Sequence, residues 1–221
     1  MPPRVRRAVD LTVPLDATTQ VYPGDPAVAF ESVATVREHG FNLLGVRMGS
    51  QSGTNCDAPL HVIDGAPPID ATDLTLWVGP AKVMDVTGLA ARTPISVDLI
   101  APQLEGMGPR TIALLHTGWD AHWRTPAFLD HPFLDPAAAT LMLDHGIRTF
   151  ALDAMNIDET PLDEGPVALP CHHLIAERGG VIVENLTNLG AIEFDPFVVM
   201  LPLRLTGADG SPTRAVALDL A

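Results

Sequence analysis

Two polar segments of the chain carry residue types that can perform acid–base or metal chemistry. The first, residues 51–61, reads QSGTNCDAPLH. Its Gly-Thr turn and Pro59 are incompatible with a smooth helix or strand, so we expect an irregular loop that exposes polar side chains. Asp57 and His61 in this loop can form an acid–base pair or share a metal ion.

The second segment contains His172 and Glu184. His172 falls in a predicted helix over residues 169–178, and Glu184 ends the apolar run Val181–Glu184. Two glycines between them reverse the chain and bring the helix and the strand end into one neighbourhood. Because buried acids need partners, a carboxylate at the end of a buried strand is poorly explained as core filler.

Short apolar runs bounded by Pro, Gly and Asp predict the elements that position these side chains. Helices are expected over residues 95–104, 135–145 and 169–178, with Asp135 capping the second, and a tight turn over 22–26. The predicted strands cover residues 8–14, 41–48, 81–86, 111–116, 150–153, 181–184, 198–205 and 215–220. This mixture predicts a layered α/β or α+β domain, and residues 1–221 are interpreted as one domain.

Composition restricts the partners. The chain has 13 basic and 27 acidic residues and a formal net charge of −14, which argues against nucleic acid or an anionic membrane as a partner. No apolar stretch follows residues 1–7, and no run reaches the roughly 18 apolar residues of a membrane span. Two cysteines do not indicate a disulfide framework, so a cytoplasmic protein that acts on a small molecule is expected.

Taken together, these residues resemble the cyclase family that includes bacterial kynurenine formamidase and related metal-dependent hydrolases. The family signature is His-x-Gly-Thr-His-x-Asp-x-Pro-x-His, and this chain has Gln51, Asn55, Asp57 and His61 at four of its polar positions. Segments near residues 10–12, 22–25, 116–119, 152–153 and 172–189 also match in order. The resemblance implies an α/β fold of β/β/α layers, swivelling-domain-like with a mixed sheet, and a homodimer whose partner helps to shape the site.

The resemblance also implies metal ligands. In the family, the first two signature histidines and the Asp hold one metal, and the Asp, a distant His and a Glu hold a second. Asp57, His172 and Glu184 match the second set. Gln51 and Asn55 stand where the two imidazoles belong, and neutral amides are weak ligands for zinc, so the first metal site is interpreted as lost. The expected cofactor is none or one divalent ion, zinc or manganese.

Other roles follow from the same match. His61 corresponds to the proton-transfer residue, which Asp57 or Glu184 is expected to orient. Tyr22 falls where formamidases have an aromatic side chain that packs on the substrate. The remaining substrate-binding candidates are Gln51, Asn55 and Thr54, of which the two amides are expected to donate hydrogen bonds to a substrate carbonyl or enolate oxygen.

Three functions remain open at this point. The main hypothesis is a diverged enzyme in which His61 catalyses the cyclisation, isomerisation or dehydration of a small carbonyl compound of specialised metabolism. The alternative is a single-metal hydrolase of an amide, formamide or lactone. The third is a small-molecule binding protein without catalysis.

Overall fold

The computed structural model describes residues 4–161 and 167–221. The strands are β1 (Val5–Asp10), β2 (Ala29–Ala34), β3 (Leu43–Arg47), β4 (Asn55–Asp57), β5 (Val78–Asp85), β6 (Pro94–Ile95), β7 (Ile112–His116), β8 (Phe133–Leu134), β9 (Thr149–Leu152), β10 (Val181–Glu184), β11 (Phe197–Val199), β12 (Gly210–Pro212) and β13 (Val216–Leu220). The helices are α1 (Val36–His39), α2 (Val97–Ile100), α3 (Pro136–Asp144) and α4 (Pro170–Glu177), and short 3-10 turns include η1 (Pro59–His61) and η4 (Ala101–Gln103).

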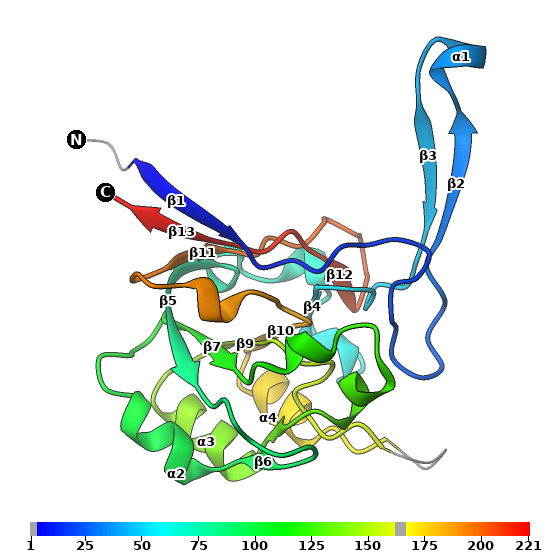
Figure 1. Ribbon diagram of the computed structural model, residues 1–221. Coiled ribbons are helices and arrows are strands. Elements are labelled where there is room, and N and C mark those ends of the chain that lie inside the picture. The colour runs from blue at the N-terminus through cyan, green and yellow to red at the C-terminus, as the bar shows by residue number, and fades with distance from the viewer. Residues whose placement is uncertain (1–3, 162–166) are drawn as a thin grey trace.

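Nine strands form one mixed sheet in the order β1-β13-β11-β5-β7-β9-β10-β4-β12 (Figure 1). The four central strands β5, β7, β9 and β10 run parallel to one another, and the other described pairs of this sheet are antiparallel. Parallel neighbours need crossover connections, and α2, α3 and α4 lie together on one face of the sheet (Figure 1). The predicted α/β class with a mixed sheet is confirmed.

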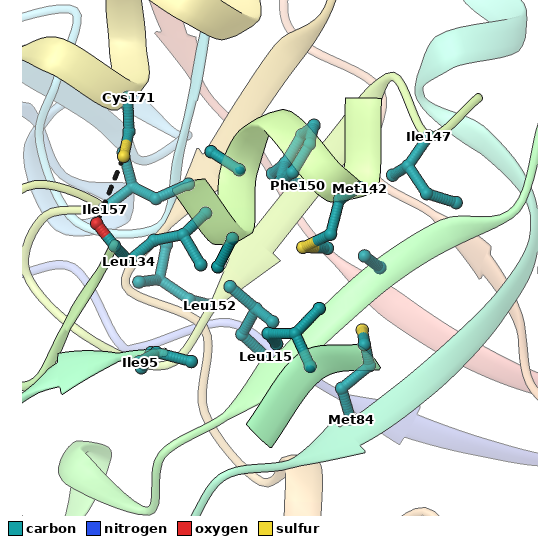
Figure 2. Packing of buried hydrophobic residues seen from close by; sticks show 14 of the residues in the cluster. Met84, Ile95, Leu115, Leu134, Met142, Ile147, Phe150, Leu152, Ile157 and Cys171 are labelled. Atoms are coloured by element: carbon teal, nitrogen blue, oxygen red, sulfur yellow. Dashed lines mark hydrogen bonds between the residues drawn. The ribbon is translucent and has the colours of Figure 1, made fainter. Parts of the chain in front are cut away.

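Two apolar clusters separate the layers. One lies between the helices and the parallel strands, where Met142 of α3 packs with Leu115 and Phe150 of the sheet (Figure 2). The other fills the inside of the curled sheet, where Leu11 and Val198 join Val183. Both clusters are closed to water, so they hold the central strands rigidly and fix the strand ends from which polar side chains project.

Several predicted elements are shorter in the structure. The helix over 95–104 divides into α2 and η4 because Pro102 lacks the N–H that an α-helix needs. The strand over 198–205 ends at Val199, and beyond it the Leu203 N–H donates to the Ser211 hydroxyl. Residues 51–61 are not wholly irregular, because β4 lies between β10 and β12.

Other local predictions are confirmed. Asp135 caps α3 by accepting a hydrogen bond from the Ala137 N–H at 2.7 Å, and Pro136 is the first helical residue. The tight turn closes through the Asp25 N–H, which donates to the Tyr22 carbonyl. Among the described residues, none of the helices has the length and apolar character needed to cross a bilayer.

His131 is a structural residue rather than a site residue. Its ring is 1% exposed, and its two nitrogens lie 2.8 Å from the Pro132 carbonyl and 2.8 Å from the Thr160 hydroxyl. A neutral ring that donates to the carbonyl and accepts from the hydroxyl satisfies both contacts. Burial is the main reason that the pKa of His131 falls from 6.5 to about 4.

This shift predicts a loss of stability in mild acid. Between the unfolded pKa of 6.5 and the folded pKa of about 4, the unfolded chain binds a proton that the folded chain does not, so stability falls as the pH falls. From pH 7 to pH 5 the loss from this residue is about 2 kcal/mol. In urea unfolding at both pH values, His131→Gln should remove about that much of the pH dependence. Equal pH dependence in the wild-type protein and His131→Gln would contradict the assignment.

Candidate metal centre

Strand pairing brings two carboxylates to one place. Where β4 pairs with β10, Glu184 of β10 lies opposite Asn55 of β4. Asp57 follows Asn55 by two residues in β4. Alternate residues of a strand point to the same face, so Asn55 and Asp57 share a face, while Cys56 points the other way into the apolar cluster. Cys56 therefore points away from Asp57.

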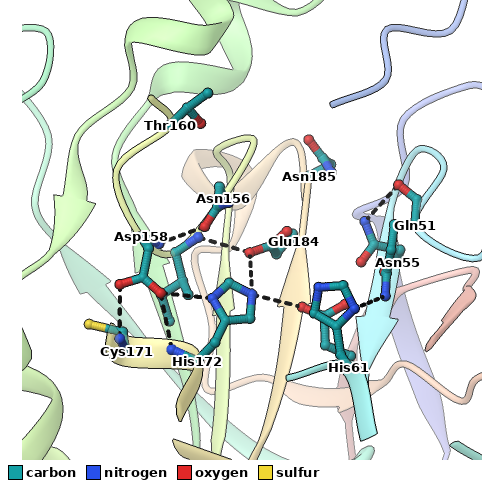
Figure 3. Close-up of polar contacts among 12 residues, drawn as sticks. Gln51, Asn55, His61, Asn156, Asp158, Thr160, Cys171, His172, Glu184 and Asn185 are labelled. Atoms are coloured by element: carbon teal, nitrogen blue, oxygen red, sulfur yellow. Dashed lines mark hydrogen bonds and ion pairs between the residues drawn. The ribbon is translucent and has the colours of Figure 1, made fainter. Parts of the chain in front are cut away.

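Helix α4 adds a histidine to this pair. One donor atom each from Asp57, His172 and Glu184 lie within 4.8 Å of one another, and all three residues are buried. The His172 Nε2 is 3.4 Å from the Asp57 Oδ2 and 3.6 Å from the Glu184 Oε1 (Figure 3). The structure therefore brings together the three residues that the sequence indicated as ligands of one ion.

The residues fit a cation. Both carboxylate oxygens of Asp57 are buried, and neither has a hydrogen-bond partner among the described residues. A buried carboxylate without a hydrogen-bond donor is costly, and a cation bound between Asp57, His172 and Glu184 would lower that cost. Two carboxylates and one imidazole are also a ligand set that catalytic metal ions use, with the remaining positions open to water or substrate.

Asp158 positions His172. Its carboxylate lies 2.8 Å from the His172 Nδ1 and also accepts the backbone N–H groups of Cys171 and His172 in the first turn of α4 (Figure 3). The Nδ1–H therefore donates to Asp158, and the Nε2 faces the other two carboxylates. Metal-binding histidines commonly have such a carboxylate behind them. Asp158 was not identified from the sequence, although an acid soon after the buried strand over 150–153 was a signal.

The electrostatics of the cluster favour an added positive charge. Burial lowers the pKa of His172, but the hydrogen bond to Asp158 and the neighbouring carboxylates of Asp57 and Glu184 outweigh it and raise this pKa to about 10. Burial, followed by the charge of Asp57, raises the pKa of Glu184 to about 8. Both groups thus hold protons more tightly than usual, which is the behaviour expected of a site that a metal ion can occupy.

His61 borders the cluster at the end of η1. Its ring centroid is 5.6 Å from that of His172, and its Nδ1 lies 2.9 Å from the Asp209 Oδ2. Asp209 was not identified from the sequence; we expected Asp57 or Glu184 to orient His61. Burial lowers the pKa of His61, but the hydrogen bond to Asp209 is the chief reason that the net shift is upward.

Asp209 reaches His61 because β12 pairs with β4. Gly210 lies opposite Asp57 in this register, and the Asp209 carbonyl accepts the Ala58 N–H. A Cβ added at Gly210 would come within 2.6 Å of the Cys56 carbonyl oxygen and would overlap the Gln51 amide, so the close approach requires glycine.

The amides of Gln51 and Asn55 have hydrogen-bond partners inside the protein. The Gln51 Nε2 donates to Asp209 at 3.0 Å, and the Asn55 Nδ2 donates to the Gly53 carbonyl at 3.0 Å. Asn185 donates to the same carbonyl, and the amide oxygens of all three residues lack partners among the described residues. Both amide nitrogens thus make contacts within the protein, and their expected role as donors to a substrate carbonyl stays a prediction.

A pocket of about 400 Å³ opens over the cluster. Tyr22, Gln51 and Asn55 line it as expected, together with His61 and the three candidate ligands. Thr54 is not among the lining residues: its hydroxyl donates to the Asn185 carbonyl and accepts the Val13 N–H. Thr54 thus joins the two loops beside the pocket, and its role in substrate binding stays a prediction.

A curled mixed sheet that presents one histidine and two carboxylates in a pocket defines an α/β protein with a candidate metal centre. Residues 9–159 match the Cyclase family model, described as "Putative cyclase". The chain belongs to this family.

Relatives in the family support a hydrolase. The chain is 32% identical to the kynurenine formamidase of Bacillus cytotoxicus over 215 residues, which covers 96% of this chain and 97% of the relative. It is 30% identical to that of Bacillus mycoides over 210 residues, covering 94% and 95%. These names support an enzyme of hydrolase type, and they favour the hydrolase alternative over the main hypothesis of cyclisation.

Solved structures agree in fold. A potential metal-dependent hydrolase with cyclase activity superposes with a TM-score of 0.78 at 27% identity, covering 96% of this chain and 98% of that one. An isatin hydrolase bound to thioisatinate gives a TM-score of 0.87 at 24% identity over 97% and 92% of the two chains. The second likeness concerns the fold alone.

Proposed function

We propose that this chain is a single-metal hydrolase that cleaves an amide, formamide or lactone bond. The observation that carries the proposal is the cluster of Asp57, His172 and Glu184, whose donor atoms lie within 4.8 Å of one another beside a pocket. A divalent ion, zinc or manganese, would supply polarisation of the scissile carbonyl and activation of the attacking water. The same ligand set is compatible with either ion.

The chain's own residues supply binding and proton transfer. Asp158 holds the His172 ring so that its Nε2 stays directed at the centre. Asp209 accepts the His61 Nδ1–H, which leaves the His61 Nε2 lone pair free to take a proton from water and to pass it to the leaving group. Tyr22 and the apolar side chains of Met155 and Leu169 surround the rest of the substrate.

Turnover of a simple formamide tests this function. Formanilide hydrolysis, followed as aniline release, should stop after exhaustive chelation and return when one equivalent of zinc or manganese is added. His61→Ala should bind the ion normally but lose about 100-fold or more in kcat, the range of general acid–base catalysis. Undiminished hydrolysis by the chelated protein would reject the metal role and return support to metal-free catalysis.

We further propose that the chain acts as a homodimer through the hairpin of β2, α1 and β3. This hairpin stands away from the body (Figure 1), and Val33, Phe41 and Leu44 on it are each more than half exposed. The same chain has an apolar groove of about 700 Å³ at the hairpin base, where Leu201 and Leu203 are exposed. An apolar arm and an apolar groove on one chain are self-complementary, as a two-fold dimer requires.

Sedimentation should therefore show a dimer. The double variant Phe41→Glu and Leu44→Glu should sediment as a monomer, because it places charges on the apolar arm. Arg37→Glu, which changes the charge of the exposed α1 without removing apolar surface, should remain dimeric. A monomeric wild-type protein at micromolar concentration would reject the dimer.

A further inference from the structure

Acids outnumber bases among the residues that line the pocket over the metal centre. Its lining residues include the four acids Asp25, Asp57, Glu184 and Asp209, and among the described residues no lysine or arginine lines it. Asp158 adds a fifth carboxyl group behind His172. A divalent ion offsets two of these charges and a protonated His61 a third, so the pocket stays negative when loaded.

Uncharged polar groups in the pocket wall reinforce this polarity. The amide nitrogens of Gln51, Asn55 and Asn185 are used within the protein, and the oxygens that remain are acceptors. The Tyr22 hydroxyl lies in the same negative electrostatic potential. Its pKa is raised by burial and then by the charges of Glu184 and Asp25. The potential in the pocket therefore disfavours an anionic group and favours a cation.

Apolar side chains form the rest of the wall. Pro26, Met155 and Leu169 line the pocket with Tyr22. Asp25 lies among them and is exposed, and its carboxylate has no hydrogen-bond partner among the described residues. It is thus an acid that is free to pair with an amine on a substrate whose reacting group sits at the metal centre.

We propose that the pocket selects substrates whose remainder is apolar and neutral or carries an amine, that it disfavours carboxylates, and that Asp25 determines this preference. The kinetic test of this preference rests on the proposed hydrolysis. A binding measurement tests the same preference without turnover. Neither the amine preference nor the role of Asp25 follows from the metal centre, because the centre acts only on the scissile group.

Three matched formanilides test the preference: 4-methyl (neutral), 4-aminomethyl (cationic) and 4-carboxy (anionic). Each kcat/KM is divided by the rate constant for alkaline hydrolysis of the same compound to remove electronic effects. The cationic substrate should exceed the anionic one by at least about tenfold at low salt, a difference that shrinks as salt rises. Equal values, or a preference for the carboxylate, would overturn the proposal.

Variants assign the effect to Asp25. Asp25→Lys should lower the cation-to-anion ratio about tenfold, and Asp25→Asn should lower it by an intermediate factor. Glu177→Lys, at the exposed end of α4, makes the same change in net charge outside the pocket and should leave the ratio unchanged. A ratio that shifts equally in the Asp25→Lys and Glu177→Lys variants would reject Asp25 as the determinant.

Binding separates failure of this proposal from failure of the proposed function. Calorimetry with the matching anilines, 4-methylaniline, 4-(aminomethyl)aniline and 4-aminobenzoate, needs no turnover. If none of the formanilides is hydrolysed but the amine still binds at least about tenfold more tightly than the carboxylate, only the hydrolase proposal fails. If the anilines bind equally, the charge preference fails whatever the kinetics show.

Discussion

Replacing Asp57 by asparagine should reduce formanilide hydrolysis on the order of 1000-fold, because a catalytic metal ion supplies several kcal/mol of transition-state stabilisation. Asp57 contributes the carboxylate whose Oδ2 lies 3.4 Å from the His172 Nε2, and neither of its oxygens has a hydrogen-bond partner among the described residues. Asparagine keeps the shape and removes the charge. Since loss of a group behind a ligand already costs about 10–100-fold in metal affinity, loss of this ligand should cost at least about 100-fold.

Asp153→Asn is the matched control for Asp57→Asn. Asp153 is also fully buried, but it accepts hydrogen bonds from Thr117 and the Gly118 N–H rather than facing the pocket. Its substitution should lower the free energy of unfolding and leave the metal content per folded chain unchanged. If Asp57→Asn kept wild-type metal content and turnover, Asp57 would not be a ligand.

Replacing Asp209 by asparagine should lower kcat about 100-fold with a small change in KM, because the carboxylate acts on the base and not on the substrate. Asp209 fixes the Nδ1–H form of His61 through a 2.9 Å contact and is itself held by the Ser50 hydroxyl and the Gln51 amide. An asparagine amide can present either an oxygen or a nitrogen to the ring, so that the required tautomer is no longer enforced.

Nitrogen-15 spectra of the histidine rings provide a readout that a structural role would not move. In the wild-type protein, the neutral His61 should carry its proton on Nδ1, and Asp209→Asn should mix the two tautomers. Asp209→Glu should recover part of kcat. Asp70→Asn removes a carboxylate that holds the same loop through the Gly207 N–H, and it should leave the His61 tautomer unchanged. An unaltered tautomer in Asp209→Asn would contradict the role of Asp209.

The sequence could predict the candidate metal ligands because each lies in a segment with a local signal. Asp57 is part of a recognisable signature, and a two-glycine turn connects His172 to Glu184. The mixed sheet and α3 were predictable for similar reasons, since apolar runs and the Asp135 cap are short-range features.

The positioning residues could not be predicted in this way. Asp209 reaches His61, 148 positions earlier in the chain, only because the three-residue strand β12 pairs with β4. A strand of that length has no periodicity to detect. The orientation of the Asn185 amide depends on the Gly53 carbonyl, 132 positions away, and no local pattern encodes it.

Activity measured against bound metal tests the central claim most directly. Metal-free protein is loaded stepwise with zinc or manganese, and the ion content per chain and the rate of formanilide hydrolysis are measured on the same samples. A single ion held by Asp57, His172 and Glu184 predicts a rate that rises linearly and reaches its plateau at one ion per chain. Full activity without metal, or a plateau that requires two ions per chain, would contradict the account.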